Sequence, residues 1–185
     1  FAGQWDEVQA KAKTGEVDML LAAYKNEERL TYMDYSIPYV VDPIALFVKK
    51  GNNFDYSKWS DLISKKGVLT VGDSYGQTLD DYIKNNLNVT RVDTVDEAFV
   101  MLENGKADYF IYALYSGEKI LSVKKLSDEI EILPKYVSSE DFFMTISKKS
   151  PLIKYMPEIN EKLEEYKKDG TIDDLLTKYR NLYLK

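Results

Sequence analysis

The sequence contains neither cysteine nor histidine. Without cysteine the chain forms no disulfide, offers no thiolate nucleophile and has no Cys-ligated zinc site. Without histidine it lacks the commonest metal ligand and the side chain that most often transfers protons near neutral pH. We therefore expect no catalytic residue, no metal site and no cofactor.

Basic charge and long apolar runs are also scarce. The 25 Lys and Arg residues are outnumbered by 31 Asp and Glu, which gives a net charge of −6 and argues against nucleic acid as a partner. No apolar run approaches the ~20 residues that span a bilayer. The chain has 185 residues, enough for one domain or two small ones, and begins at Phe1 without Met, so we expect a piece of a longer protein.

Helical and strand-like segments alternate along the chain. Trp5, Val8 and Ala12 share one helical face that ends at Gly15. Buried strands are predicted at 18–23, 44–48, 68–71 and 108–112, and helices at 27–31, 75–85 and 94–104, with two more at the C-terminus separated by Gly170. This alternation predicts an α/β fold with mostly parallel strands.

One pattern occurs twice. A helix, a glycine and an aspartate precede an apolar strand at Gly15–Asp18 and again, 90 residues later, at Gly105–Asp108. The repetition favours two lobes built alike, although any connection between a helix and a strand can have this form.

Three segments follow predicted strands, where ligands bind in open α/β sheets. The first contains Tyr24, Asn26 and Arg29, and the guanidinium of Arg29 suits a carboxylate. An exposed pair between Arg29 and Glu27 or Glu28 is the alternative. The second contains Gly72, Ser74 and Tyr75 at an expected helix start, which can bind an anion or can be an ordinary turn and cap. The third, Tyr112 and Ala113 with neighbouring aromatic residues, lines a cleft or packs in the core.

Together these segments resemble the type II periplasmic solute-binding proteins, specifically bacterial extracellular solute-binding family 3. The resemblance rests on an ordered set of motifs that covers nearly the whole chain: Gly15–Asp18, Asn26-x-x-Arg29, Asp34–Tyr39, Gly72–Tyr75, Thr94–Asp108, Phe142–Lys149 and Asp169–Thr171.

The resemblance implies a two-lobed α/β protein that closes on its ligand. Lobe 1 would comprise residues 1–42 and 143–185, and lobe 2 residues 43–142. Arg29 matches the arginine that clamps a ligand carboxylate, and Asn26 stands where the family usually has a threonine. Ser74 and Tyr75 match positions whose backbone N–H groups face the same carboxylate.

Two departures from the family pattern affect these expectations. The aspartate that binds a ligand α-ammonium group would fall at Ala113, and Tyr112 or Glu140 is the expected substitute. The strands and helix that normally open lobe 1 precede Phe1, so lobe 1 is expected to be incomplete at its N-terminus.

The predicted function is capture of a small carboxylate-bearing solute, an amino acid or a related compound, for a membrane permease of an ABC importer. The protein would be a monomer outside the cytoplasm, periplasmic or extracellular, with or without a membrane anchor. Two alternatives stay open: the ligand-sensing ectodomain of a histidine kinase or chemoreceptor, and a dehydratase-like enzyme on the same fold.

Overall fold

The computed structural model describes residues 3–183, which form two compact units. Unit 1 comprises residues 3–41 and 140–179, and unit 2 comprises residues 42–139 and 180–183. Each unit has its own strand pairings and its own buried core.

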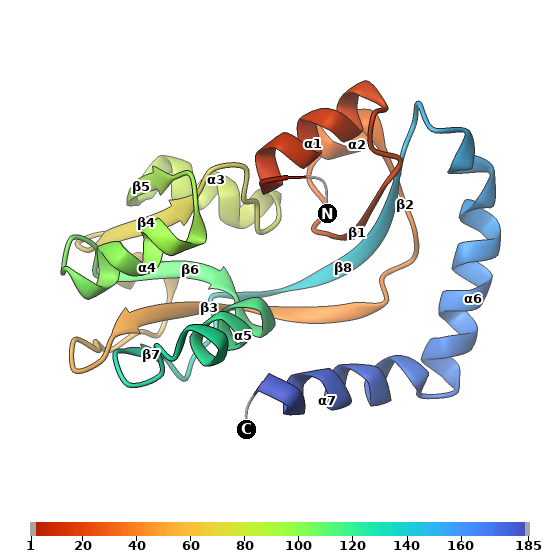
Figure 1. The fold of residues 1–185 in the computed structure, drawn as a ribbon. Coiled ribbons are helices and arrows are strands. Elements are labelled where there is room, and N and C mark those ends of the chain that lie inside the picture. The colour runs from red at the N-terminus through yellow and green to blue at the C-terminus, as the bar shows by residue number, and fades with distance from the viewer. Residues whose placement is uncertain (1–2, 184–185) are drawn as a thin grey trace. The chain divides into compact units, whose positions relative to one another are not determined.

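Unit 1 combines helices with a small antiparallel sheet (Figure 1). In it β8 pairs antiparallel with both β1 and β2. The elements that lie wholly or mainly in unit 1 are α1 (Trp5–Thr14), β1 (Met19–Ala23), α2 (Glu27–Tyr32), β2 (Met33–Tyr35), β8 (Ser138–Ser147), the 3-10 helix η2 (Pro151–Tyr155), α6 (Met156–Lys168) and α7 (Thr171–Tyr183).

Local sequence signals explain where α1 begins and ends. Gly15 adopts a left-handed conformation with φ of 89° and ends the helix, as its position after the apolar face predicts. Ala12 on that face is fully buried and packs with Leu20 of β1 and Met33 of β2. The helix and sheet of unit 1 are therefore joined by a small apolar cluster.

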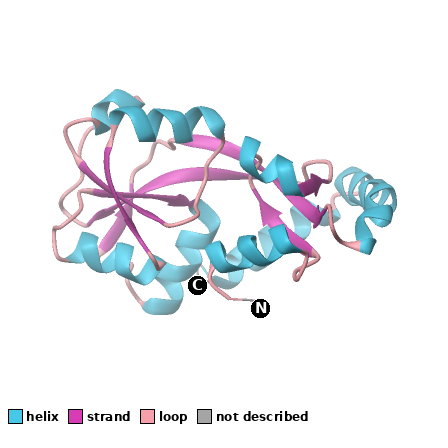
Figure 2. Cartoon of the chain, turned by 90° about the horizontal axis from the view of Figure 1, so that it is seen from above, coloured by secondary structure: helices cyan, strands magenta, loops and turns pink. Residues whose placement is uncertain are grey.

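Unit 2 is built on a mixed sheet whose strands run in the order β7-β3-β6-β4-β5. Figure 2 shows helices on both sides of these strands. The elements are β3 (Val40–Lys49), η1 (Trp59–Leu62), β4 (Lys66–Thr70), α3 (Gln77–Asn86), β5 (Asn88–Val92), α4 (Val95–Glu103), β6 (Tyr109–Ala113), α5 (Leu114–Lys124) and β7 (Ile130–Ile132).

The α/β class is confirmed, but the expectation of mostly parallel strands is wrong. β4 pairs in parallel with β5 and β6, through helical crossovers that such pairs require. The pairs of β3 with β6 and β7, and of β8 with β1 and β2, are antiparallel. β3 and β8 have ten residues each, so β3 is longer than the predicted strand at 44–48.

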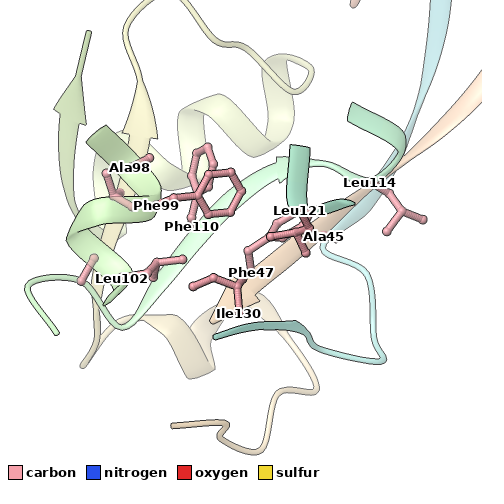
Figure 3. Close-up of a cluster of buried hydrophobic side chains, with 11 residues drawn as sticks. Ala45, Phe47, Ala98, Phe99, Leu102, Phe110, Leu114, Leu121 and Ile130 are labelled. Atoms are coloured by element: carbon pink, nitrogen blue, oxygen red, sulfur yellow. The ribbon is translucent and has the colours of Figure 1, made fainter. Parts of the chain in front are cut away.

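The core of unit 2 is a cluster of aromatic and aliphatic side chains between the sheet and helices α4 and α5 (Figure 3). Phe47 of β3, Phe99 of α4 and Phe110 of β6 meet with ring centroids 5.4–6.2 Å apart. Such tilted and edge-on contacts stabilise aromatic clusters beyond the burial of area alone. This core packs α4 and α5 against the sheet.

Helix α4 begins with an N-terminal cap at Thr94. The Thr94 hydroxyl accepts the backbone N–H of Glu97 at 3.2 Å, and the Glu97 carboxylate accepts the N–H of Asp93 at 3.1 Å. By contrast, α3 begins at Gln77 and not near Tyr75. Gly76 is its N-cap residue. Its φ of 87° is a conformation that residues other than glycine rarely adopt.

Candidate functional site

In unit 1 the end of β1 and the first turn of α2 bring three predicted residues together. Asn26 is the N-cap of α2, and its Oδ1 accepts the backbone N–H of Arg29 at 2.8 Å. Arg29 then reaches back, and its Nη1 donates to the carbonyl oxygen of Tyr24 at 2.9 Å. The N-cap bond and the tight turn thus place the guanidinium at the end of the strand.

The side chain of Arg29 is buried, with only 2% of the residue exposed. The alternative of an arginine on an exposed helix face, paired with Glu27 or Glu28, is therefore wrong. Its Nε donates to Oε1 of Gln9 at 2.8 Å, and the Trp5 ring lies 5.4 Å from its Cζ atom. Both Gln9 and Trp5 come from α1, which the sequence analysis did not connect with the site.

Aromatic side chains surround this end of unit 1. The ring of Tyr24 stacks on Phe142 of β8 with centroids 4.6 Å apart and planes 4° from parallel. Tyr35 meets Phe143 edge-on at 5.4 Å. Burial raises the pKa of Tyr35 to about 12, an effect that the nearby positive charge of Arg29 partly opposes. The Arg29 guanidinium is itself buried, and burial strengthens its interactions with anions.

In unit 2 the turn after β4 is held by two aspartates. Asp80 of α3 accepts the Ser74 hydroxyl with one oxygen and, at 2.8 Å, the backbone N–H of Tyr75 with the other. Asp73 accepts the Thr70 hydroxyl, and the Tyr75 hydroxyl lies 3.0 Å from the same carboxylate. The N–H of Tyr75, expected to face a ligand, donates to Asp80.

Because α3 starts later than predicted, the N–H groups at its first turn belong to Gln77 and the residues after it. Sequence reasoning missed this segment because Gly72 and Ser74 already form a plausible turn and cap. The signal that could have found it is Gly76 directly before a polar pair and the first apolar helical residue, Leu79.

The third predicted segment lies at the end of β6, beside the turn. Since β4 and β6 are parallel, their carboxyl ends share one edge of the sheet, and the Tyr75 hydroxyl lies 2.9 Å from the carbonyl oxygen of Ile111. Ala113 is buried at the start of α5 and offers only a methyl group.

A residue that sequence reasoning missed lies at the same edge. Asp42 of β3 is fully buried, and one carboxylate oxygen lies 3.5 Å from the backbone nitrogen of Tyr115. Burial raises the pKa of the Tyr112 hydroxyl, and the negative charges of Asp73 and Asp42 raise it further. Aspartate within an otherwise apolar strand, next to Pro43, is the sequence signal that could have marked this position.

The predicted residues thus form two sets. Tyr24, Asn26 and Arg29 lie together in unit 1, and the other five belong to unit 2: Gly72, Ser74, Tyr75, Tyr112 and Ala113. In the described part of the chain, no three Asp or Glu side chains gather as potential metal ligands. None of the helices within residues 3–183 has the length and apolar character needed to cross a bilayer.

Comparison with known proteins places these observations in a family. The chain is 25% identical over 180 residues to the L-cystine-binding protein TcyJ of Escherichia coli. This alignment covers 95% of this chain and 65% of TcyJ. The chain is 32% identical over 152 residues to PatH of Vibrio harveyi, which is named as an amino-acid ABC transporter-binding protein, covering 78% of this chain and 57% of PatH. The chain thus spans about two thirds or less of the length of these relatives.

Solved structures agree with this placement. An ancestral arginine-binding protein, bound to arginine, superposes with a TM-score of 0.75 at 26% identity, covering 95% of this chain and 77% of that one. Residues 2–181 match the family of bacterial extracellular solute-binding proteins, family 3, which is a family of binding proteins and not of enzymes. The predicted resemblance is confirmed, and the chain belongs to the bacterial extracellular solute-binding proteins, family 3.

Proposed function

We propose that the protein binds a free amino acid through its carboxylate, with Arg29 as the main contact, and delivers it outside the cytoplasm to the permease of an ABC importer. The observation that carries the proposal is the buried guanidinium of Arg29, oriented by Tyr24 and Gln9. Burying a charge is costly unless the charge is paired and hydrogen-bonded. A guanidinium in a fixed plane matches a carboxylate with two parallel hydrogen bonds.

The names of the relatives support an amino acid as ligand. They refer to cystine, to amino acids and to arginine, which share the α-carboxylate and α-ammonium groups but differ in side chain. A protein that recognises this shared part needs a cation for the carboxylate, and Arg29 supplies it.

Recognition of the ammonium group must differ from the family pattern, because Ala113 is uncharged. Asp42 and Asp73 supply negative charge at the same edge of unit 2, and both act on Tyr112. This edge of unit 2 suits a cationic group.

Titration calorimetry on the intact protein with L-arginine, L-lysine and L-cystine tests the role of Arg29. Arg29→Lys keeps the charge but loses the planar fork, and we expect the affinity to fall at least about tenfold. Truncation in Arg29→Ala should cost about 2–5 kcal/mol of binding free energy. Arg91→Lys, a matched exchange of an exposed arginine, should bind as the wild type does.

Agmatine, which is arginine without its carboxylate, provides the complementary measurement. We expect it to bind much more weakly than L-arginine to the wild-type protein and equally weakly to both Arg29 variants. Unchanged affinity in Arg29→Lys and Arg29→Ala, or agmatine binding as tightly as arginine, would refute the proposed carboxylate contact.

A further inference from the structure

Two side chains of α1 contact the guanidinium of Arg29 from one helical face. Trp5 and Gln9 are four residues apart and therefore neighbours on the helix surface. Gln9 Oε1 accepts the Nε–H of Arg29 at 2.8 Å across 20 residues of sequence, and the Trp5 ring lies 5.4 Å from Cζ. α1 thus helps to hold the guanidinium, although it belongs to none of the three segments that the sequence analysis assigned to candidate sites.

The bond from Gln9 determines how the guanidinium is oriented. Nε lies where the aliphatic stem joins the planar group, and Nη1 lies on one of its arms. With Nε bonded to Gln9 and Nη1 bonded to the carbonyl of Tyr24, two points of a rigid plane are held, so its rotation about the stem is restricted.

Gln9 is itself held in the orientation that this role requires. Its Nε2 donates to the backbone carbonyl of Trp5 at 3.3 Å, while its Oε1 accepts from Arg29. The amide nitrogen of Gln9 therefore donates to a carbonyl oxygen, and its oxygen accepts from a guanidinium. Only one of the two possible orientations of the side-chain amide satisfies both bonds.

The chemistry of position 9 matters as much as its geometry. Glutamine accepts the Nε–H bond without carrying a charge. The carbonyl of Tyr24, which accepts from Nη1, and the ring of Trp5, which lies near Cζ, are also uncharged. A glutamate has nearly the same size and would accept the same bond, but its negative charge would offset that of the guanidinium and compete with an anionic ligand.

We infer that Gln9 is a positioning residue: its neutral amide orients Arg29 for a ligand carboxylate without cancelling the charge that attracts it. This inference rests on the proposed function, since it concerns the affinity for the same carboxylate. A purely structural role, in which Gln9 only satisfies a buried N–H group, would be filled equally well by glutamate.

The test compares Gln9→Glu and Gln9→Met with the wild type, in the intact protein, by calorimetry with L-arginine, L-lysine and L-cystine and by thermal unfolding. We expect Gln9→Glu to bind at least about tenfold more weakly while unfolding at the same or a higher temperature. Gln9→Met, which keeps the length and removes the acceptor, should bind about threefold to tenfold more weakly. Gln4→Glu adds the same charge at an exposed position before α1 and should change the affinity less than twofold.

A measurement without ligand tests the positioning directly. The chain has three arginines, Arg29, Arg91 and Arg180, so their Nε–H signals can be assigned by substitution in nitrogen-15 NMR spectra. We expect the Nε–H of Arg29 to exchange slowly with solvent in the wild type and in Gln9→Glu, and faster in Gln9→Met.

The outcomes separate this inference from the proposed function. If the wild type binds an amino acid and Arg29→Lys weakens binding, but Gln9→Glu and Gln9→Met bind as the wild type does, the role of Gln9 is refuted and the function stands. If no probe binds the wild type, the proposed function and this inference both fail. Equally fast Nε–H exchange in the wild type and Gln9→Met refutes the positioning by itself.

Discussion

At the scale of single residues, two buried tyrosines show how far hydrogen bonding varies within one core. Tyr75 is 2% exposed, and its hydroxyl lies 2.9 Å from the carbonyl of Ile111 and 3.0 Å from the carboxylate of Asp73. Tyr109 is fully buried, and its hydroxyl has no hydrogen-bond partner among residues 3–183. That hydroxyl lies against Gly67, where a Cβ atom would come within 2.7 Å of it.

This contrast predicts opposite effects for the same substitution. Tyr109→Phe removes a buried hydroxyl that makes no compensating bond, so we expect the free energy of unfolding to stay equal or rise by up to about 1 kcal/mol. Tyr75→Phe should lower it by about 1–2 kcal/mol because Ile111 and Asp73 lose a neighbour. Urea denaturation of both variants measures the difference, and a clear loss of stability in Tyr109→Phe would contradict it.

At the scale of secondary-structure elements, glycines explain why two helices were misread. Gly117 lies inside α5, where a Cβ atom would come within 2.0 Å of the Phe47 ring, so only glycine lets the helix pack this closely. Glycine inside a helix weakens the helical pattern. No loop separates β6 from α5, which also made the start of the helix hard to recognise, and α5 was not predicted. α3 was predicted too early because Gly76 was not recognised as its N-cap residue.

The last turn of α7, which belongs to unit 2, forms an ion pair with α5. Arg180 donates from Nε and Nη2 to the two carboxylate oxygens of Glu118 at 2.8 and 2.7 Å, and its guanidinium lies 5.1 Å from the centroid of the Tyr115 ring. The Glu118 side chain is only 14% exposed, and the proximity of its carboxylate raises the pKa of Arg180. Two-point geometry and partial burial make this pair stronger than an ordinary surface pair.

Glu118→Gln should therefore lower the free energy of unfolding by about 1 kcal/mol, measured by urea denaturation. The matched control is Glu165→Gln, which breaks the exposed pair between Lys162 and Glu165, where the side chains are 61% and 53% exposed. We expect the control to change stability by less than about 0.5 kcal/mol. Equal effects of the two substitutions would show that the geometry of the Arg180 pair adds nothing.

At the scale of the whole molecule, the many tyrosines make stability depend on pH at alkaline values. Burial raises the pKa of Tyr35 and of Tyr56 to about 12, from an ordinary value of 10.0. Between these values the unfolded chain has lost protons that the folded chain still holds. The tyrosines therefore contribute their full stability below pH 10, and that contribution falls as the pH rises from 10 to 12.

Thermal unfolding across this pH range tests the linkage. We expect the unfolding temperature of the wild type to fall from pH 10 to 12, and Tyr35→Phe to show a shallower fall because one linked group is gone. Tyr155→Phe, at a tyrosine that is 42% exposed, controls for the loss of a hydroxyl. A fall in Tyr35→Phe as steep as in the wild type would contradict the prediction.

Local sequence patterns by themselves determined the α/β class, the helix that ends at Gly15, the cap at Thr94 and the family motifs around Arg29, because each depends on residues close in sequence or on the order of short segments along the chain. Only the tertiary structure decided which strands are antiparallel, that Asp42 lies near Tyr112, and that Gln9 holds Arg29. These features join side chains 20 or more residues apart, and packing between elements, not local propensity, selects such contacts.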